Sequence, residues 1–214
     1  MIGDRLVITD YHRDGAAKIF DALRARLDRG RTLAVTVAGE SGCGKSETAH
    51  CLAELLTQEG WTSLILGQDD YFKLPPCSNH EKRLADIDWV GTGEVRLDLL
   101  DEHLAALKND PDRPLTKPLV YFEEDRIGSE VLPGGRRDVV IAEGTYTTLL
   151  TNADVRAFIN RDYRQTKLSR LKRARDPDVD FLEQVLEIEH GEIATHRTRA
   201  DVVIAPPGTC TLSP

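Results

Sequence analysis

The sequence predicts an α/β fold with a parallel β-sheet covered by helices on both faces. Short apolar segments rich in Val and Ile alternate with segments whose apolar residues recur at helical spacing, and this alternation is typical of strand–helix–strand units. At 214 residues the chain is long enough for one substantial domain, and we expect a single domain over 1–214. In such sheets, ligands bind at the carboxyl ends of the strands.

The first third of the chain contains three predicted strands and two predicted helices. Residues 5–9 (RLVIT) predict a short strand, and residues 14–29 carry apolar side chains at the spacing of an amphipathic helix. Residues 32–39 (TLAVTVAG) form an apolar run rich in β-branched residues, which is typical of a buried parallel strand. After a turn that contains glycines, residues 45–58 predict a helix and residues 61–66 (WTSLIL) predict the next strand.

The middle of the chain is less regular. Residues 71–96 contain two adjacent prolines and two glycines, and we predict irregular structure there. Residues 97–108 predict a helix, and residues 118–132 predict a hairpin around Gly128, which lies between two short apolar segments. Residues 138–144 (DVVIAEG) then predict another buried strand, which ends in an acid and a glycine.

The last part of the chain returns to the alternating pattern. Residues 155–160 predict a strand, residues 180–196 a helix, and residues 200–208 a final strand that is stopped by two prolines. Between them, residues 161–175 contain seven basic residues against a single acid, Asp162. A basic stretch inside an acidic protein requires a local explanation.

The overall composition narrows the function classes. The net charge of −8 argues against broad nucleic-acid binding, which requires a basic surface. No apolar run approaches the roughly 18 residues of a membrane span, and the N-terminus carries charges where a signal peptide would be apolar. We therefore expect a cytoplasmic protein without nucleic-acid or membrane partners. Its cysteines are expected to be free thiols: Cys43, Cys51, Cys77 and Cys210.

The turn at residues 39–46 carries the most specific pattern in the chain. GESGCGKS fits GxxxxGK[ST] without a mismatch, between a predicted strand and a predicted helix. Its glycines let backbone N–H groups converge on phosphate oxygens, next to the positive end of the helix. Lys45 is expected to reach the β- and γ-phosphates and Ser46 to bind Mg²⁺, so the sequence predicts a P-loop NTPase fold that binds ATP and Mg²⁺. The predicted nucleotide contacts are Gly39, Glu40, Ser41, Gly42, Cys43, Gly44, Lys45, Ser46 and Glu47.

Two acids at strand ends are candidates for the chemistry of phosphoryl transfer, which needs an oriented acceptor and neutralised charge. Asp69 is placed to take the proton from an acceptor hydroxyl, whereas Asp70 would point elsewhere on an extended backbone. The alternative is that both acids solvate a loop or cap a helix. Glu143 is predicted to hold the metal directly or through water, unless it only terminates its strand.

The basic stretch predicts an arginine-rich lid at about residues 161–180. Arg170 and Arg173 lie three residues apart and so share one helix face. There they would neutralise the charge that develops in the transition state, and Arg175 joins them if the helix ends before it. The alternative is a solvated, charged helix face.

Taken in order, these blocks resemble the uridine kinase and phosphoribulokinase family of P-loop kinases. The resemblance runs from about Thr32 to Gly208 and leaves residues 1–30 as an N-terminal extension. It implies a kinase that phosphorylates a small molecule with Mg·ATP, and family members often assemble as homo-oligomers. The P-loop is common to many families, so the later blocks make the resemblance specific.

Four later blocks carry the resemblance. GQDDYF (67–72) is similar to the family's S-Q-D-S-F-Y block, whose aspartate, the catalytic base, is matched by Asp69. VVIAEGTY (139–146) is similar to its strand ending in V-x-E-G, which places Glu143 near the metal. RDYRQTKLSRLKRARD resembles the lid, with Arg170, Arg173 and Arg175 as phosphate contacts, and RADVVIAPPG resembles the block near the nucleotide base.

The departures from the family fall where the acceptor should bind. Uridine kinases carry a D-H-P block, but here Asp88 is followed by Trp89 and Val90. They also carry a histidine in Y-D-F-x-x-H-x-R, and the nearest stretch, VYFEEDR (120–126), lacks it and is one residue shorter. The resemblance therefore implies a kinase more strongly than it implies uridine as the acceptor.

The acceptor contacts that remain are Tyr71, Asp88, Tyr121 and Arg126. An aromatic pocket of Tyr71, Trp89 and Tyr121 would stack a nucleoside base, although each of these side chains could equally pack in the core.

Three other interpretations stay open. An anionic acceptor, such as a sugar phosphate or a vitamin precursor, would use Arg126, Arg136 and Arg137. A nucleotide-driven switch would change partners upon hydrolysis, although the N-K-x-D stretch of guanine-reading switches is missing from the sequence. A homologue that binds ATP without catalysis is the third, and the intact set of Lys45, Ser46, Asp69 and Glu143 argues against it.

Overall fold

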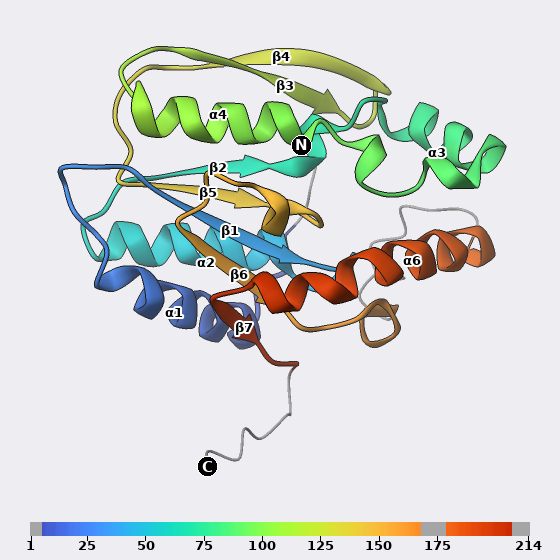
Figure 1. Cartoon of the computed structure of the whole chain (residues 1–214), viewed down its shortest axis with the longest axis horizontal. Helices are drawn as coiled ribbons and strands as arrows, with labels where there is room; N and C mark the ends of the chain where they lie inside the picture. Colours follow the sequence, from blue (N-terminus) through green and yellow to red (C-terminus); the bar gives the residue numbers. More distant parts are fainter. Residues whose placement is uncertain (1–5, 168–178, 207–214) are drawn as a thin grey trace.

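The computed structural model describes residues 6–167 and 179–206. Its centre is a five-stranded parallel sheet (Figure 1). In spatial order the strands are β2 (Ser63–Gly67), β5 (Val139–Glu143), β1 (Leu33–Gly39), β6 (Val155–Ile159) and β7 (Val202–Ile204). β1 pairs with β5 on one side and with β6 on the other. The predicted α/β fold is confirmed, and β1 ends at the crevice where the strand order changes direction.

Helices cover both faces of this sheet, as predicted. The helices in the described ranges are α1 (Asp10–Arg24), α2 (Lys45–Gln58), α3 (Pro76–Ala85), α4 (Leu97–Asn109) and α6 (Val179–Ile193), of which α3 lies beyond the strand ends. In Figure 1, α1 and α2 lie on one side of the sheet and α4 on the other. Along β1, Val35 and Val37 belong to the apolar cluster with α1 and α2, whereas Ala34 and Ala38 belong to the cluster with α4. This two-sided burial explains why β1 is apolar without interruption.

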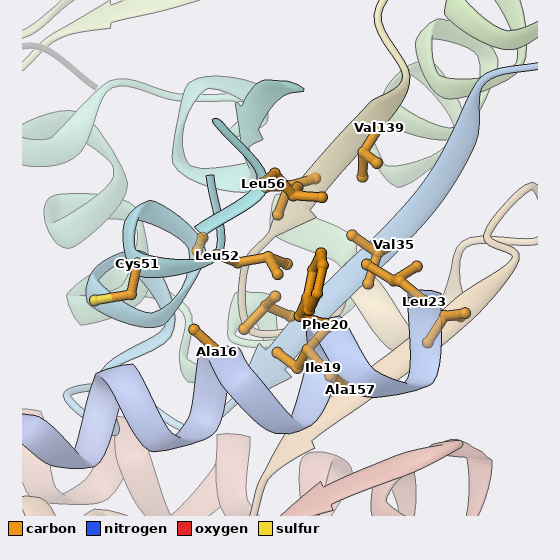
Figure 2. Close-up of a cluster of buried hydrophobic side chains, with 14 of the residues drawn as sticks. Ala16, Ile19, Phe20, Leu23, Val35, Cys51, Leu52, Leu56, Val139 and Ala157 are labelled. Carbon is orange, nitrogen blue, oxygen red and sulfur yellow. The ribbon is translucent and has the colours of Figure 1, made fainter. Parts of the chain in front are cut away.

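The cluster beneath α1 and α2 ties these helices to the sheet (Figure 2). Phe20 of α1 and Leu52 of α2 lie between the two helices and the strands, next to Val35 and Val139. Leu52, Val35 and Val139 are fully buried. Because α2 begins directly after the glycine-containing turn, this core holds that turn at the end of β1.

The predicted hairpin is formed by β3 (Leu115–Tyr121) and β4 (Arg126–Leu132), which pair antiparallel. Its turn lies at 122–125, and the prediction of a turn at Gly128 is wrong because that glycine pairs with Leu119 inside β4. Asp125 has a left-handed φ of 43°. Its carboxylate accepts hydrogen bonds from the backbone N–H groups of Cys77 and Ser78 and from the Ser78 hydroxyl. The hairpin turn therefore caps the start of α3.

Two local predictions are wrong. Residues 6–9 form no strand, because Thr9 is the N-cap of α1 and its backbone N–H donates to His12 Nδ1 of the first helical turn. The region 71–96 is less irregular than predicted, since it contains α3 and short 3-10 turns. Pro76 occupies the first position of α3, where a proline starts a helix rather than breaking it.

The remaining elements agree with the sequence to within a few residues at their ends. In the described ranges Cys43, Cys51 and Cys77 are free thiols, as expected. None of the helices in the described part of the chain is long and apolar enough to cross a membrane.

We expect Leu52→Ala to lower the free energy of unfolding by about 2–5 kcal/mol, because it removes a fully buried side chain between α2 and the sheet. The measurement is urea unfolding followed by circular dichroism. The matched control is Leu84→Ala, which truncates a leucine that is 52% exposed and should change the free energy by less than about 0.5 kcal/mol. Equal losses in both variants would contradict this account of the core.

Candidate functional site

The turn after β1 is shaped by close contacts that only glycine permits. Gly39 has a φ of 151°, and a Cβ atom there would lie 2.7 Å from Cys43 Sγ and 2.9 Å from the carbonyl oxygen of Ile159. Gly44 has a φ of 101°, and its Cβ would lie 2.5 Å from His12 Nε2. The turn is thus packed against both β6 and α1 at the carboxyl edge of the sheet.

The cation of the motif lies over this turn. Lys45 is the first residue of α2, and its Nζ donates a 3.0 Å hydrogen bond to the carbonyl oxygen of Glu40. The same carbonyl accepts the backbone N–H of Cys43 at 3.2 Å. The free N–H groups of the helix N-terminus and the ammonium group together form a site suited to phosphate.

Two predicted groups meet at the strand ends beside Lys45. Glu143 ends β5 and lies in register with Val37 of β1 and with Gly67 of β2. Dense protein surroundings and then the Asp69 carboxylate raise the pKa of Glu143 to about 7, while Lys45 and a hydrogen bond from Ser46 act in the opposite direction. These four side chains are therefore close enough to interact, as their positions in the sequence predicted.

The residues at this point fit a magnesium ion. Burial and the Asp69 carboxylate raise the pKa of Glu143, and a metal held by Ser46 and Glu143 would add positive charge that favours the ionised carboxylate. The described ranges contain no group of three His, Cys, Asp or Glu side chains arranged to hold a metal. A hard cation here would thus depend on phosphate oxygens and water for its other ligands, which is typical of magnesium–nucleotide sites.

The two neighbouring aspartates have different surroundings. Asp69 lies in the short turn at Gln68–Tyr71 and is exposed. Asp70 is buried, forms a 2.8 Å ion pair with Lys117 and accepts the backbone N–H of Val120 at 3.1 Å. Asp70 thus anchors the hairpin, and Asp69 is the acid that faces the site.

A cavity of about 410 Å³ begins at these groups. Ser46, Asp69 and Glu143 lie on its wall, together with Asp70, Lys117 and Glu130. The rest of the wall is mainly aliphatic, with Leu6, Leu64, Ile65, Leu119 and Leu132 beside Gly67 and His50. Lys117 is already paired with Asp70 and, at 3.2 Å, with Glu130. The cavity wall is therefore acidic and aliphatic.

The predicted aromatic pocket is not what lines this cavity. Tyr71 is fully buried, and its hydroxyl lies 2.9 Å from His103 Nδ1, which favours the packing interpretation. The Arg126 guanidinium stacks 3.9 Å above the ring of Tyr121 and is paired with Glu124. Asp88 is exposed on the chain after α3. None of these predicted acceptor contacts belongs to the described wall of the cavity.

The lid arginines Arg170, Arg173 and Arg175 lie outside the described residues. Residues on either side of them are tied to the P-loop by contacts that the sequence did not predict. The Glu40 carboxylate accepts the backbone N–H of Tyr163 and pairs with His190 of α6, both at 2.7 Å. A glutamate at a variable position of the motif gives no signal for such a partner 150 residues away.

A second missed contact involves Gln68. Its side-chain oxygen accepts the backbone N–H of Tyr146 at 2.7 Å, and a Cβ atom on Gly144 would lie 2.2 Å from Gln68 Cβ. This packing explains why a glycine follows Glu143. It holds the turn that carries Asp69 against the end of β5.

The chain has distant sequence relatives, although no family model matches it. It is 26% identical over 189 residues to a bifunctional alpha-galactosidase/sucrose kinase of Mediterraneibacter gnavus, covering 82% of this chain but only 20% of that protein. It is 26% identical over 150 residues to a uridine kinase of Leuconostoc citreum, covering 67% of this chain and 69% of the relative. The chain therefore spans a fifth of the first of these proteins and about two thirds of the second.

Solved structures show the same fold. A possible uridine kinase from Bacillus stearothermophilus superposes with a TM-score of 0.64 at 19% identity, over 90% of this chain and 98% of that one. A phosphoribulokinase from Rhodobacter spheroides gives a TM-score of 0.63 at 12% identity, over 81% of this chain and 70% of that one. The five-stranded sheet and its helices are thus those of P-loop kinase structures.

We expect Gly44→Ala to destabilise the protein by more than the roughly 1–2 kcal/mol of left-handed backbone strain alone, since the new methyl group meets His12. Urea unfolding measures the loss. In a His12→Ala background the same change should cost less, because the clash is removed. Gly93→Ala is the control, since a Cβ there meets nothing within 4 Å. An equal cost with and without His12 would contradict the packing argument.

Proposed function

We propose that this chain, a distant member of the uridine kinase and phosphoribulokinase-like P-loop kinases, transfers the γ-phosphoryl group of Mg·ATP to a hydroxyl of a small molecule. The observation that carries the proposal is the meeting of Lys45, Ser46, Asp69 and Glu143 at one end of a cavity. A purely nucleotide-binding site has no need of an exposed carboxylate beside an acceptor-sized space.

Each group has a separate role in the proposed reaction. The N–H groups of the P-loop and Lys45 bind the phosphates, and Ser46 and Glu143 hold Mg²⁺, which neutralises phosphate charge when bound. Asp69 accepts the proton of the acceptor hydroxyl. The hydroxyl oxygen then bonds to the γ-phosphorus as the bond from that phosphorus to the bridging oxygen breaks, which releases ADP. If they reach the site, Arg170 and Arg173 would stabilise the charge of the transferring group, with Arg175 as a further phosphate contact.

The cavity wall favours a neutral acceptor. Asp69, Asp70, Glu130 and Glu143 contribute carboxylates to it, whereas its one lysine, Lys117, is paired with Asp70 and Glu130. An anionic acceptor would be repelled by this wall. Arg126 is paired with Glu124, and Arg137 donates to backbone carbonyls, so neither supports the anionic alternative.

Two neutral acceptors fit the proposal, a nucleoside and a sugar. The nucleoside follows from the likeness to uridine kinases and would use Tyr121, Asp88 and Arg126 at the hairpin turn and after α3. The sugar is favoured by the largely aliphatic wall of the described cavity, which contains no Phe, Tyr or Trp, and by the relative whose name includes a sucrose kinase. We also propose a cytoplasmic location and homo-oligomeric assembly. The composition supports the first and the family resemblance supports the second.

We expect Asp69→Asn to lower kcat by about 100-fold or more while Mg·ATP still binds, because the amide cannot take the hydroxyl proton. The measurement is acceptor-dependent ADP release, with calorimetry to follow nucleotide binding. Asp21→Asn, which neutralises an exposed aspartate on α1, is the matched control and should leave kcat unchanged. Full activity of Asp69→Asn would remove the proposed base.

We expect kcat/KM to be at least about tenfold higher for a neutral acceptor than for an anionic one, because the cavity wall is acidic. The panel consists of uridine, cytidine, sucrose and fructose against ribulose 5-phosphate and pantothenate. Turnover with an anion alone would overturn the argument from the wall. ADP release that no acceptor accelerates would instead favour the nucleotide-driven switch.

A further inference from the structure

The second residue of the P-loop, Glu40, has its side chain turned away from the phosphate site. Only 6% of the residue is exposed. One carboxylate oxygen accepts the backbone N–H of Tyr163 at 2.7 Å, and the other lies 2.7 Å from His190 Nδ1 of α6. An ionised carboxylate can only accept hydrogen bonds, so the imidazole must donate through Nδ1. A buried carboxylate is costly unless it is paired, and here both of its oxygens are.

The backbone of the same residue organises the P-loop itself. Its carbonyl oxygen accepts Lys45 Nζ at 3.0 Å and the N–H of Cys43 at 3.2 Å. The next carbonyl, that of Ser41, accepts the hydroxyl of the fully buried Thr166 at 2.9 Å. The side chain of Glu40 is thus held by Tyr163 and by His190 of α6, and the neighbouring Ser41 carbonyl is held by Thr166. The backbone carbonyl of Glu40 in turn holds Lys45.

The ring contacts reinforce this arrangement. Tyr163 and His190 meet edge to face, with their centroids 5.6 Å apart.

The GxxxxGK[ST] pattern demands no particular residue at position 40, and the backbone N–H groups that bind phosphate do not require a carboxylate beside them. The glutamate and its partners therefore require an explanation beyond the motif.

We propose that Glu40 and His190 are a positioning pair that holds the P-loop in its triphosphate-binding conformation. The pair makes nucleotide affinity depend on α6, an element that lies outside the motif. In this proposal both side chains act through the backbone of Glu40, whose carbonyl oxygen binds Lys45, rather than by contacting the phosphates. The inference rests on the proposed binding of Mg·ATP.

The experiment is calorimetric titration of the full chain with Mg·ATP. We expect His190→Leu to raise the Kd by about tenfold, the size of effect typical of losing one hydrogen bond to a charged group. His190→Asn should largely restore binding, because its amide nitrogen can donate from nearly the same place as Nδ1. The matched control is His196→Leu, which removes another buried imidazole whose Nδ1 lies 2.9 Å from Thr148 Oγ1. It should lower the Tm and leave the Kd unchanged.

A double variant separates positioning from simple charge repulsion. His190→Leu leaves the negative charge of Glu40 without its partner, and this charge alone could weaken binding of a triphosphate. Glu40→Gln/His190→Leu removes that charge but does not restore the link to α6. If the pair positions the loop, the double variant binds as weakly as His190→Leu; wild-type affinity in the double variant would overturn the proposal.

The remaining outcomes are equally decisive. An unchanged Kd in His190→Leu, or an equal loss of affinity in His196→Leu, would also overturn the positioning role.

Failure of the wild-type chain to bind Mg·ATP would remove both this inference and the proposed function. Tight binding without turnover of any acceptor would count against the kinase activity alone, and the variants would still test the pair. Should His190→Leu not fold, Glu40→Gln, which preserves the shape of the side chain, is expected to raise the Kd by itself.

Discussion

The arrangement of the site depends on how closely the turn after β1 approaches its neighbours. At Gly39 the backbone lies against Cys43 and the carbonyl of Ile159, and at Gly44 it lies against His12. Protein interiors have little room to yield at such contacts. Contacts with α1 and β6 therefore fix the position of this turn and of its backbone N–H groups before any ligand binds. Preorganised dipoles of this kind need no rearrangement when charge develops.

Around this turn, carboxylates of similar chemistry differ in their partners. Asp70 is neutralised by Lys117 and supports the hairpin. Glu40 is held by His190 and a backbone N–H group. Glu143 is partly buried near the Asp69 carboxylate, and burial and then that neighbouring charge raise its pKa. The structural acids are those with partners from the protein, and the candidate functional acids are those whose neutralisation is left to a ligand.

The sequence allowed the five strands of the central sheet and their alternation with helices to be predicted, because apolar runs and glycine turns are local signals. The proximity of Lys45, Ser46, Asp69 and Glu143 could also be predicted, since the carboxyl ends of parallel strands meet at one edge of the sheet. The sequence could not identify the partners of Glu40 and Gln68, which come from positions 150 and 78 residues away. It misplaced Tyr71, whose aromatic character suits a core as well as a pocket. The sequence does not reveal α3, because proline usually breaks a helix, whereas Pro76 occupies the first position of this one.

The contact between Asp125 and the first N–H groups of α3 joins two segments that are 47 and 48 residues apart in sequence. A change in the length of the hairpin turn that carries Asp125 moves the cap, and the helix that depends on the cap must move with it. A single insertion or deletion in the hairpin turn would therefore shift α3 as well, while the turn after β1, which packs against α1 and β6, would keep its position.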